Sequence, residues 1–179
     1  MMETQVELIE RTLDVTRVGC KFSRVKSVGR QSFRGRAARA IAHSKVGHAS
    51  TTDGLTDDQL IQRAIAAAQV KVPPTLSFPG EIVSNDGRDS EIDHMTESDL
   101  RDWTRQILRS IQQDKPAVAI ELEVSRVHET VDLRNSNGGQ THFTRGWLEV
   151  EAWVERHAAG EVLVTLDDFA TAQRRQSAQ

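Results

Sequence analysis

The chain has 179 residues, of which 37% are hydrophobic and 27% are charged, and its formal net charge is −3. These values suit an ordinary globular protein with one large or two small domains. No apolar run approaches the roughly 18 residues of a membrane-spanning helix, so a spanning segment is excluded. The start is acidic and polar, without a signal-peptide pattern, and we expect a cytoplasmic protein.

Short β-strands are predicted for the first block, residues 4–52. Gln5–Glu10 begins with polar and apolar residues in alternation, and glycines stand at positions suited to turns or bulges. Ala37–Ile41 is compatible with a helix by propensity, but the flanking glycines favour a strand of a hairpin. The single cysteine, Cys20, has no disulfide or local metal partner, so we expect a buried structural thiol.

The same block holds a strong excess of positive charge. Residues 15–52 contain nine basic residues and no acid. Such a segment can bind a polyanion, but few aromatic residues interleave the charges to stack on bases. We favour a solvated sheet face, or docking onto the acidic remainder of the chain. The nine residues are Arg17, Lys21, Arg24, Lys26, Arg30, Arg34, Arg36, Arg39 and Lys45.

A first helix is predicted over 56–70. Thr56 and Gln59 have the spacing of a capping box, and Asp57 and Asp58 suit the positive end of the helix dipole. A stripe of leucine, isoleucine and small alanine side chains follows. The alanines indicate close packing on a sheet.

A linker is predicted at 71–95, where prolines, glycines and polar residues gather. It would separate a first α+β domain, 1–70, from a middle domain, 96–179. The middle domain opens with a second helix, 96–113, whose first residue Thr96 is cap-like. We expect the apolar stripe of this helix to lie in the core.

Antiparallel strands are predicted after the second helix. Apolar residues occupy even positions up to Val124 and odd positions from Val127, and a bulge near Ser125–Arg126 would account for the switch. Asn137-Gly138 is a strong hairpin signal. If these two residues form the turn, paired positions add up to 275, which places Val127 opposite Leu148.

The chain closes with another predicted strand, 162–166, preceded by a turn at 158–160 and ended by Asp167 and Asp168. The polar tail from Ala172 is expected to fray. The order of elements predicts an α+β fold, with antiparallel β-hairpins or sheets each packed with one amphipathic helix, in two small domains.

No pattern marks a catalytic, metal or cofactor site. A peptidase zinc site needs two histidines one helical turn apart and a glutamate. The only adjacent His-Glu pair, His128-Glu129, has no second histidine at helical spacing. It lies in a predicted strand, where the two side chains point to opposite faces. Glycine loops for nucleotides and a nucleophile elbow are absent from the sequence. The spacing of the other five histidines favours no three-histidine site: His43, His48, His94, His142 and His157.

Two motifs resemble the TldD/PmbA (TldD/TldE) family of zinc metallopeptidases. Gly47-His48-Ala49-Ser50-Thr51 is similar to the Gly-Phe-Ala-Ser-Thr-like motif before an alanine-rich helix, with His48 in place of the usual aromatic residue. Asn135-Ser136-Asn137-Gly138 is similar to the Asn-Ser-x-Gly turn of the middle domain. The resemblance runs from about Val6 to Phe169 and covers only the amino-terminal half of the family.

The resemblance implies that the chain has the α+β scaffold of a family of peptidases, which cleave unfolded or modified peptides. Family members hold zinc through a His-Glu-x-x-x-His helix and a later cysteine in the carboxy-terminal half, which we expect this chain to lack. It therefore implies no cofactor here, with zinc only in the missing half or in a partner. The implied partner is a homologous peptidase subunit, in a homodimer or heterodimer. No catalytic residue is carried over, and whether the chain is an enzyme stays open.

Three functions remain in competition. The first is an amino-terminal scaffold portion of a TldD/PmbA-type metallopeptidase that docks substrate or partner. The second is a stand-alone module that binds unfolded peptides or other proteins. The third, ranked last, is a nucleic-acid binder that uses residues 15–52; the family's link to DNA gyrase is a name more than a DNA-binding motif.

Overall fold

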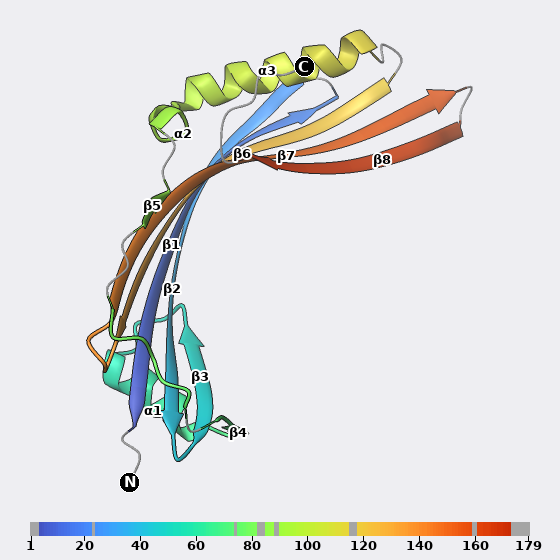
Figure 1. Ribbon diagram of the computed structural model, residues 1–179. Coiled ribbons are helices and arrows are strands. Elements are labelled where there is room, and N and C mark those ends of the chain that lie inside the picture. The colour runs from blue at the N-terminus through green and yellow to red at the C-terminus, as the bar shows by residue number, and fades with distance from the viewer. Residues whose placement is uncertain are drawn as a thin grey trace. The chain divides into compact units, whose positions relative to one another are not determined.

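The computed structural model (Figure 1) describes residues 4–22, 24–73, 75–81, 85–87, 90–114, 118–158 and 161–172. Most of these residues lie in antiparallel strands, with helices beside them, in agreement with the predicted α+β class. The elements in chain order are β1 Gln5–Lys21, β2 Arg24–Ala42, β3 Lys45–Thr51, α1 Asp57–Ala66, β4 Val70–Lys71, β5 Asn85–Gly87, α2 Ser90–His94, α3 Glu97–Asp114, β6 Val118–Asn135, β7 Gln140–Ala158 and β8 Glu161–Ala172.

The strands pair in the order β4-β3-β2-β1-β6-β7-β5, and β8 pairs with β7. The chain divides into two compact units. Unit 1 comprises residues 1–13, 33–87 and 129–144, and unit 2 comprises 14–32, 88–128 and 145–179. Each unit thus gathers three separate segments, and the division into contiguous domains 1–70 and 96–179 stays a prediction. In the described part of the chain, no helix has both the length and the apolar character needed to cross a bilayer.

In unit 1, α1 packs on the sheet as its alanine-rich stripe predicts. Leu60 and Ala64 are fully buried against Ala38 and Ala40 of β2. The strand predicted for 37–41 is therefore confirmed as part of β2. The capping box is present, with Thr56 and Gln59 each accepting a hydrogen bond from the other's backbone amide. The helix ends at Ala66 and not at residue 70, because the chain turns to form β4 against β3.

In unit 2, α3 covers the sheet through Leu100, Trp103 and Leu108, which lie in one buried cluster with residues of β1, β6 and β7. The cap-like Thr96 exchanges hydrogen bonds with Asp99. The predicted linker 71–95 contains the last residue of β4, together with β5 and α2, and its apolar residues Ile92 and Met95 join this core. Cys20 is also buried there, as predicted, and burial raises the pKa of its thiol.

The hairpin between β6 and β7 differs by one residue from the predicted register. Asn135 donates its amide to the carbonyl of Gly139, and its own carbonyl accepts from Gly138, whose φ is 84°. This is a three-residue loop with a left-handed glycine, a common alternative to the two-residue turn. His142 contacts Asp132, so the two share a sheet face and paired positions add up to 274.

The shift places Val127 and Leu148 on opposite faces. Both are buried, so burial alone could not reveal the error. Burial does change from even to odd positions where the sequence predicts, between Val124 and Ser125.

The last strand is longer than predicted. β8 pairs with β7 from Ala158↔Glu161 to Leu148↔Ala172, with an irregularity at Arg156/His157. Asp167 and Asp168, expected to end the strand, instead continue it opposite Trp153 and Ala152, because the 19-residue β7 still offers backbone partners. The predicted turn at 158–160 and the tail after 172 lie largely outside the described residues.

We predict that Gly47→Ala destabilises the protein. A Cβ at Gly47 would collide with the carbonyl oxygen of Ala64 and would lie 2.5 Å from the amide nitrogen of Ala68. These are backbone atoms of the α1 region, which cannot step aside as a side chain can, so the cost should reach about 3 kcal/mol. Urea unfolding measures it. Gly35→Ala in β2 is the matched control, since its added Cβ meets nothing within 4 Å; equal effects would contradict the packing argument.

Candidate functional site

The Asn-Ser-x-Gly motif forms a clasp in unit 1. The side-chain oxygen of Asn135 accepts hydrogen bonds from the amides of Asn137 and Gly139, at 2.9 and 3.0 Å. Its side-chain nitrogen donates to the carbonyl of Pro79 at 2.8 Å, and Asn137 donates to the carbonyl of Phe78 at 2.6 Å. The motif therefore fixes the turn and binds the segment that follows the first helix.

The clasp also holds the start of β1. Ser136 accepts from the amide of Val6 at 3.1 Å and donates its own amide to the carbonyl of Val6 at 2.8 Å. Gln5 accepts from the amide of Phe78 at 3.0 Å. Three chain segments thus meet at one turn, and the side chains of the motif are engaged in holding backbone. The motif is structural and carries no visible chemistry.

The Gly47–Thr51 motif is structural as well. Gly47 allows the close approach of the α1 region to β3, and Ala49 packs against the same buried cluster. His48, which replaces the usual aromatic residue, is exposed opposite Arg39 in β2. Its side chain therefore does not contribute to the helix packing that the motif provides.

A polar cavity of about 570 Å³ lies in unit 1, beside the start of α1. Arg36 of β2 and Arg134 of β6 both contact the carboxylate of Asp57, the first residue of α1. On β7, His142 lies 2.7 Å from the carboxylate of Asp132. The lining residues are Leu8, Ile9, Glu10, Arg36, Asp57, Asp132, Leu133, Arg134, Gln140, Thr141 and His142.

This cavity can bind but shows no catalytic arrangement. Its arginines and carboxylates largely neutralise one another, and Glu10 is held by Arg34 at 2.6 Å. The His142–Asp132 pair is more than half exposed, and the lining includes no serine or cysteine nucleophile beside it. The volume falls in the range of ligand pockets.

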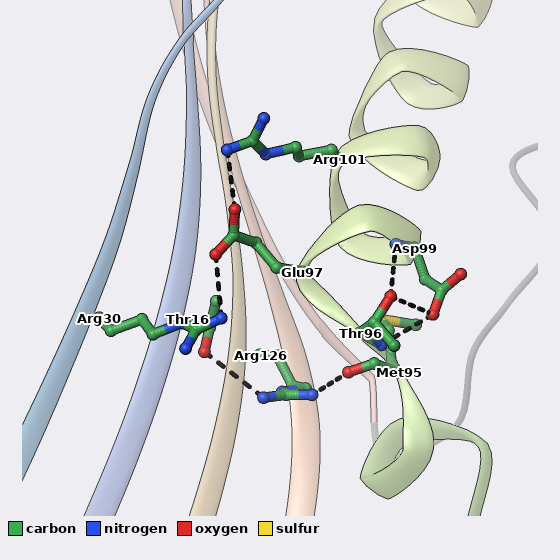
Figure 2. Close-up of polar contacts among 8 residues, drawn as sticks. All are labelled: Thr16, Arg30, Met95, Thr96, Glu97, Asp99, Arg101 and Arg126. Atoms are coloured by element: carbon green, nitrogen blue, oxygen red, sulfur yellow. Dashed lines mark hydrogen bonds and ion pairs between the residues drawn. The ribbon is translucent and has the colours of Figure 1, made fainter.

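A second polar cluster lies in unit 2 where α3 begins (Figure 2). Glu97 joins two cations, with Arg30 of β2 at 3.0 Å and Arg101 of α3 at 2.7 Å. Arg126 of β6 donates to the carbonyl of Met95, which fixes the turn before the helix. The cluster borders a cavity of about 670 Å³.

Burial and charge shift the pKa values of two groups near this cluster. The pKa of Arg126 is lowered by burial and by the nearby Arg30, and its Nε is buried without a partner among the described residues. The pKa of His128 is also lowered, chiefly by burial and then by Arg126, although Asp93 lies 3.0 Å away. Burial and the neighbouring arginine thus both disfavour the charged form of His128.

Most of the basic segment is neutralised by the chain's own acids, as we favoured from the sequence. Six of its nine basic residues form ion pairs with carboxylates on neighbouring strands or helices. The pairs are Arg17–Glu123, Lys21–Glu121, Arg30–Glu97, Arg34–Glu10, Arg36–Asp57 and Arg39–Glu7. The acidic partner of each basic residue could not be predicted from the sequence, because the pairing depends on strand order.

The described residues hold no group of three or more histidine, cysteine or acidic side chains suited to a metal ion. The pair His128-Glu129 is split as expected for a strand: His128 contacts Asp93, whereas the buried Glu129 binds Arg11. His43 forms the β2–β3 turn with a φ of 52°. The structure describes the backbone of His157 but not its side chain.

We predict that Asn135→Ala weakens unit 1, because it removes three hydrogen bonds that fix the turn and the Phe78–Pro79 segment. The free energy of unfolding should fall by about 1–3 kcal/mol. Asn135→Asp keeps the acceptor for the turn amides but loses the donor to Pro79. Urea unfolding should place this variant between wild type and Asn135→Ala; equal stability of all three proteins would refute the clasp.

Comparison with known proteins gives a likeness in structure only. No protein-family model and no curated protein matches the sequence. TldE from Thermococcus kodakarensis matches 95% of the chain with a TM-score of 0.70 and 12% identity. A candidate modulator of DNA gyrase from Thermotoga maritima gives the same coverage and TM-score at 9% identity. One from Bacteroides thetaiotaomicron matches 94% with a TM-score of 0.62 and 13% identity.

The chain spans about 40% of the length of each of these proteins. The resemblance that the two motifs suggested is therefore confirmed at the level of the fold. The protein has the fold of a part of TldE and of the related candidate gyrase modulators.

Proposed function

We propose that this chain is a scaffold portion of a TldD/PmbA-type metallopeptidase, which docks substrate or a homologous subunit in the cytoplasm. The observation that carries the proposal is the match of 95% of the chain to the fold of TldE at a TM-score of 0.70. The proposed role is proteolysis of unfolded or modified peptides by an assembly, with the zinc supplied by residues outside this chain.

The polar clusters support a docking role over a catalytic one. The cavities in both units are lined by charged groups that are already paired with one another. The paired arginines Arg30 and Arg134 remain largely exposed and can donate further hydrogen bonds to a peptide, whereas peptidase chemistry needs a metal or an activated nucleophile. The described residues hold no group suited to a metal ion, and the cavity of unit 1 is lined by no serine or cysteine.

A stand-alone peptide- or protein-binding module is the second candidate. It shares the docking surfaces and differs in having no peptidase partner. A nucleic-acid binder remains the least favoured function, because six cations of the basic segment are held by carboxylates, which lowers their attraction for phosphates.

We expect the chain, purified alone, to contain no stoichiometric zinc and to cleave no unfolded peptide. Affinity-tagged chain retained from an extract of its native cell should bring with it a zinc-bearing homologous subunit. Mass spectrometry identifies the subunit, elemental analysis measures the zinc, and a fluorogenic unfolded substrate reports cleavage. A chelator should abolish the cleavage, and added zinc should restore it.

Zinc-dependent cleavage by the chain expressed alone in an unrelated host would contradict the proposal. An eluate without metal, activity or homologous subunit would favour the stand-alone module. The tag expressed without the chain controls for contaminating peptidases.

A further inference from the structure

One stretch of β2 in unit 2 has a sheet edge without a described partner. β2 stands between β1 and β3 in the sheet order, but β3 pairs only with Arg36–Ala42. On that side, Arg24–Ser32 presents backbone N–H and C=O groups that no described strand or loop backbone contacts. Such an edge can accept a further strand.

This edge is basic. β2 contains no acidic residue, and Arg24, Lys26 and Arg30 are exposed. Arg30 is held by Glu97, whereas Arg24 and Lys26 contact no carboxylate in the part of the chain that the structure describes. At the turn before the strand, Phe22 exposes 67% of its surface and has a φ of 51°, which is uncommon for a residue other than glycine.

The regular part of the edge is short. Val25 and Val28 both pack against the core of unit 2 although they are three positions apart, so the alternation of the strand breaks between them, as in a β-bulge. Val28–Ser32 follows the break and can hydrogen bond evenly with another strand. Five residues match the length of an ordinary added strand.

The cavity of unit 2 adjoins this regular part. Arg30, Gln31 and Ser32 line it together with Thr96, Arg126 and two carboxylates, Asp14 and Glu97. Glu97 is already paired with Arg30 and Arg101, so the lining is polar and of mixed charge. A polar side chain of an added strand can therefore enter this cavity.

We propose that Val28–Ser32 pairs with an extended, acidic segment of another polypeptide, which runs on past the paired stretch so that its carboxylates reach Arg24 and Lys26. This rests on the proposed docking function and names its surface and ligand class. Backbone pairing supplies affinity, and the pocket for alternate side chains supplies specificity. The charge of the edge selects an acidic segment over a basic one.

Charged side chains and bulges also occur on edges that avoid pairing, so the test separates the two roles. The probe is a fluorescent seven-residue peptide of alternating Glu and Val, and anisotropy measures its Kd. We expect binding by the full chain, and a rise in Kd of about tenfold or more for Arg24→Glu with Lys26→Glu. A probe with N-methyl groups on alternate residues, which cannot pair with a strand, should not bind.

Lys45→Glu with Lys71→Glu is the matched control, because it makes the same charge change at exposed positions of unit 1. Absent binding, equal binding of the N-methylated probe, or an equal loss in the control would overturn the proposal. The proposed function is tested separately, by whether the variant chain still retains the zinc-bearing subunit. If the Arg24→Glu, Lys26→Glu variant still retains the zinc-bearing subunit, the edge is a peptide site apart from that contact.

Discussion

Two buried carboxylates constrain how the central strands of unit 1 can pair. Glu7 and Glu129 are each about 2% exposed, and each is bound by an arginine from an adjacent strand, Arg39 and Arg11. A buried carboxylate that loses its partner costs about 3–5 kcal/mol. Sliding β1 against β2 would separate Glu7 from Arg39, and sliding β1 against β6 would separate Glu129 from Arg11, so the two pairs together favour one register of β2-β1-β6. The Phe78 ring lies over Arg39 at 5.8 Å and extends this arrangement to the clasped segment.

Local signals in the sequence predicted local structure well. Both helix starts follow from their caps, Thr56 with Gln59 and Thr96 with Asp99, because capping joins residues three positions apart. The hairpin register was missed because Asn137-Gly138 suits two turns of different length. Only the bonds of Asn135 to Gly138 and Gly139 distinguish them.

The ion pairs between strands could not be predicted, since the two residues of each pair are far apart in the chain. Glu7 meets Arg39 across 32 positions, and Arg11 meets Glu129 across 118. Strand order decides such meetings, and a single sequence with ambiguous turns does not fix strand order. The same reasoning explains how chains of 9–13% identity share this fold. Gly47 and Asn135 satisfy backbone requirements at a few positions, and many side chains elsewhere can fill the core.

The clasp has a consequence for the timing of folding. Val6 bonds to Ser136 across 130 positions, and Gln5 to Asn137 across 132. Contacts of such long range form slowly, because the loop between them must close first. During synthesis, β1 emerges from the ribosome long before its partners at the turn have been made. The edge of β1 that pairs with β6 therefore stays unpaired while most of the chain is translated. Charged residues of β1 help to keep this edge from associating with other chains during that time.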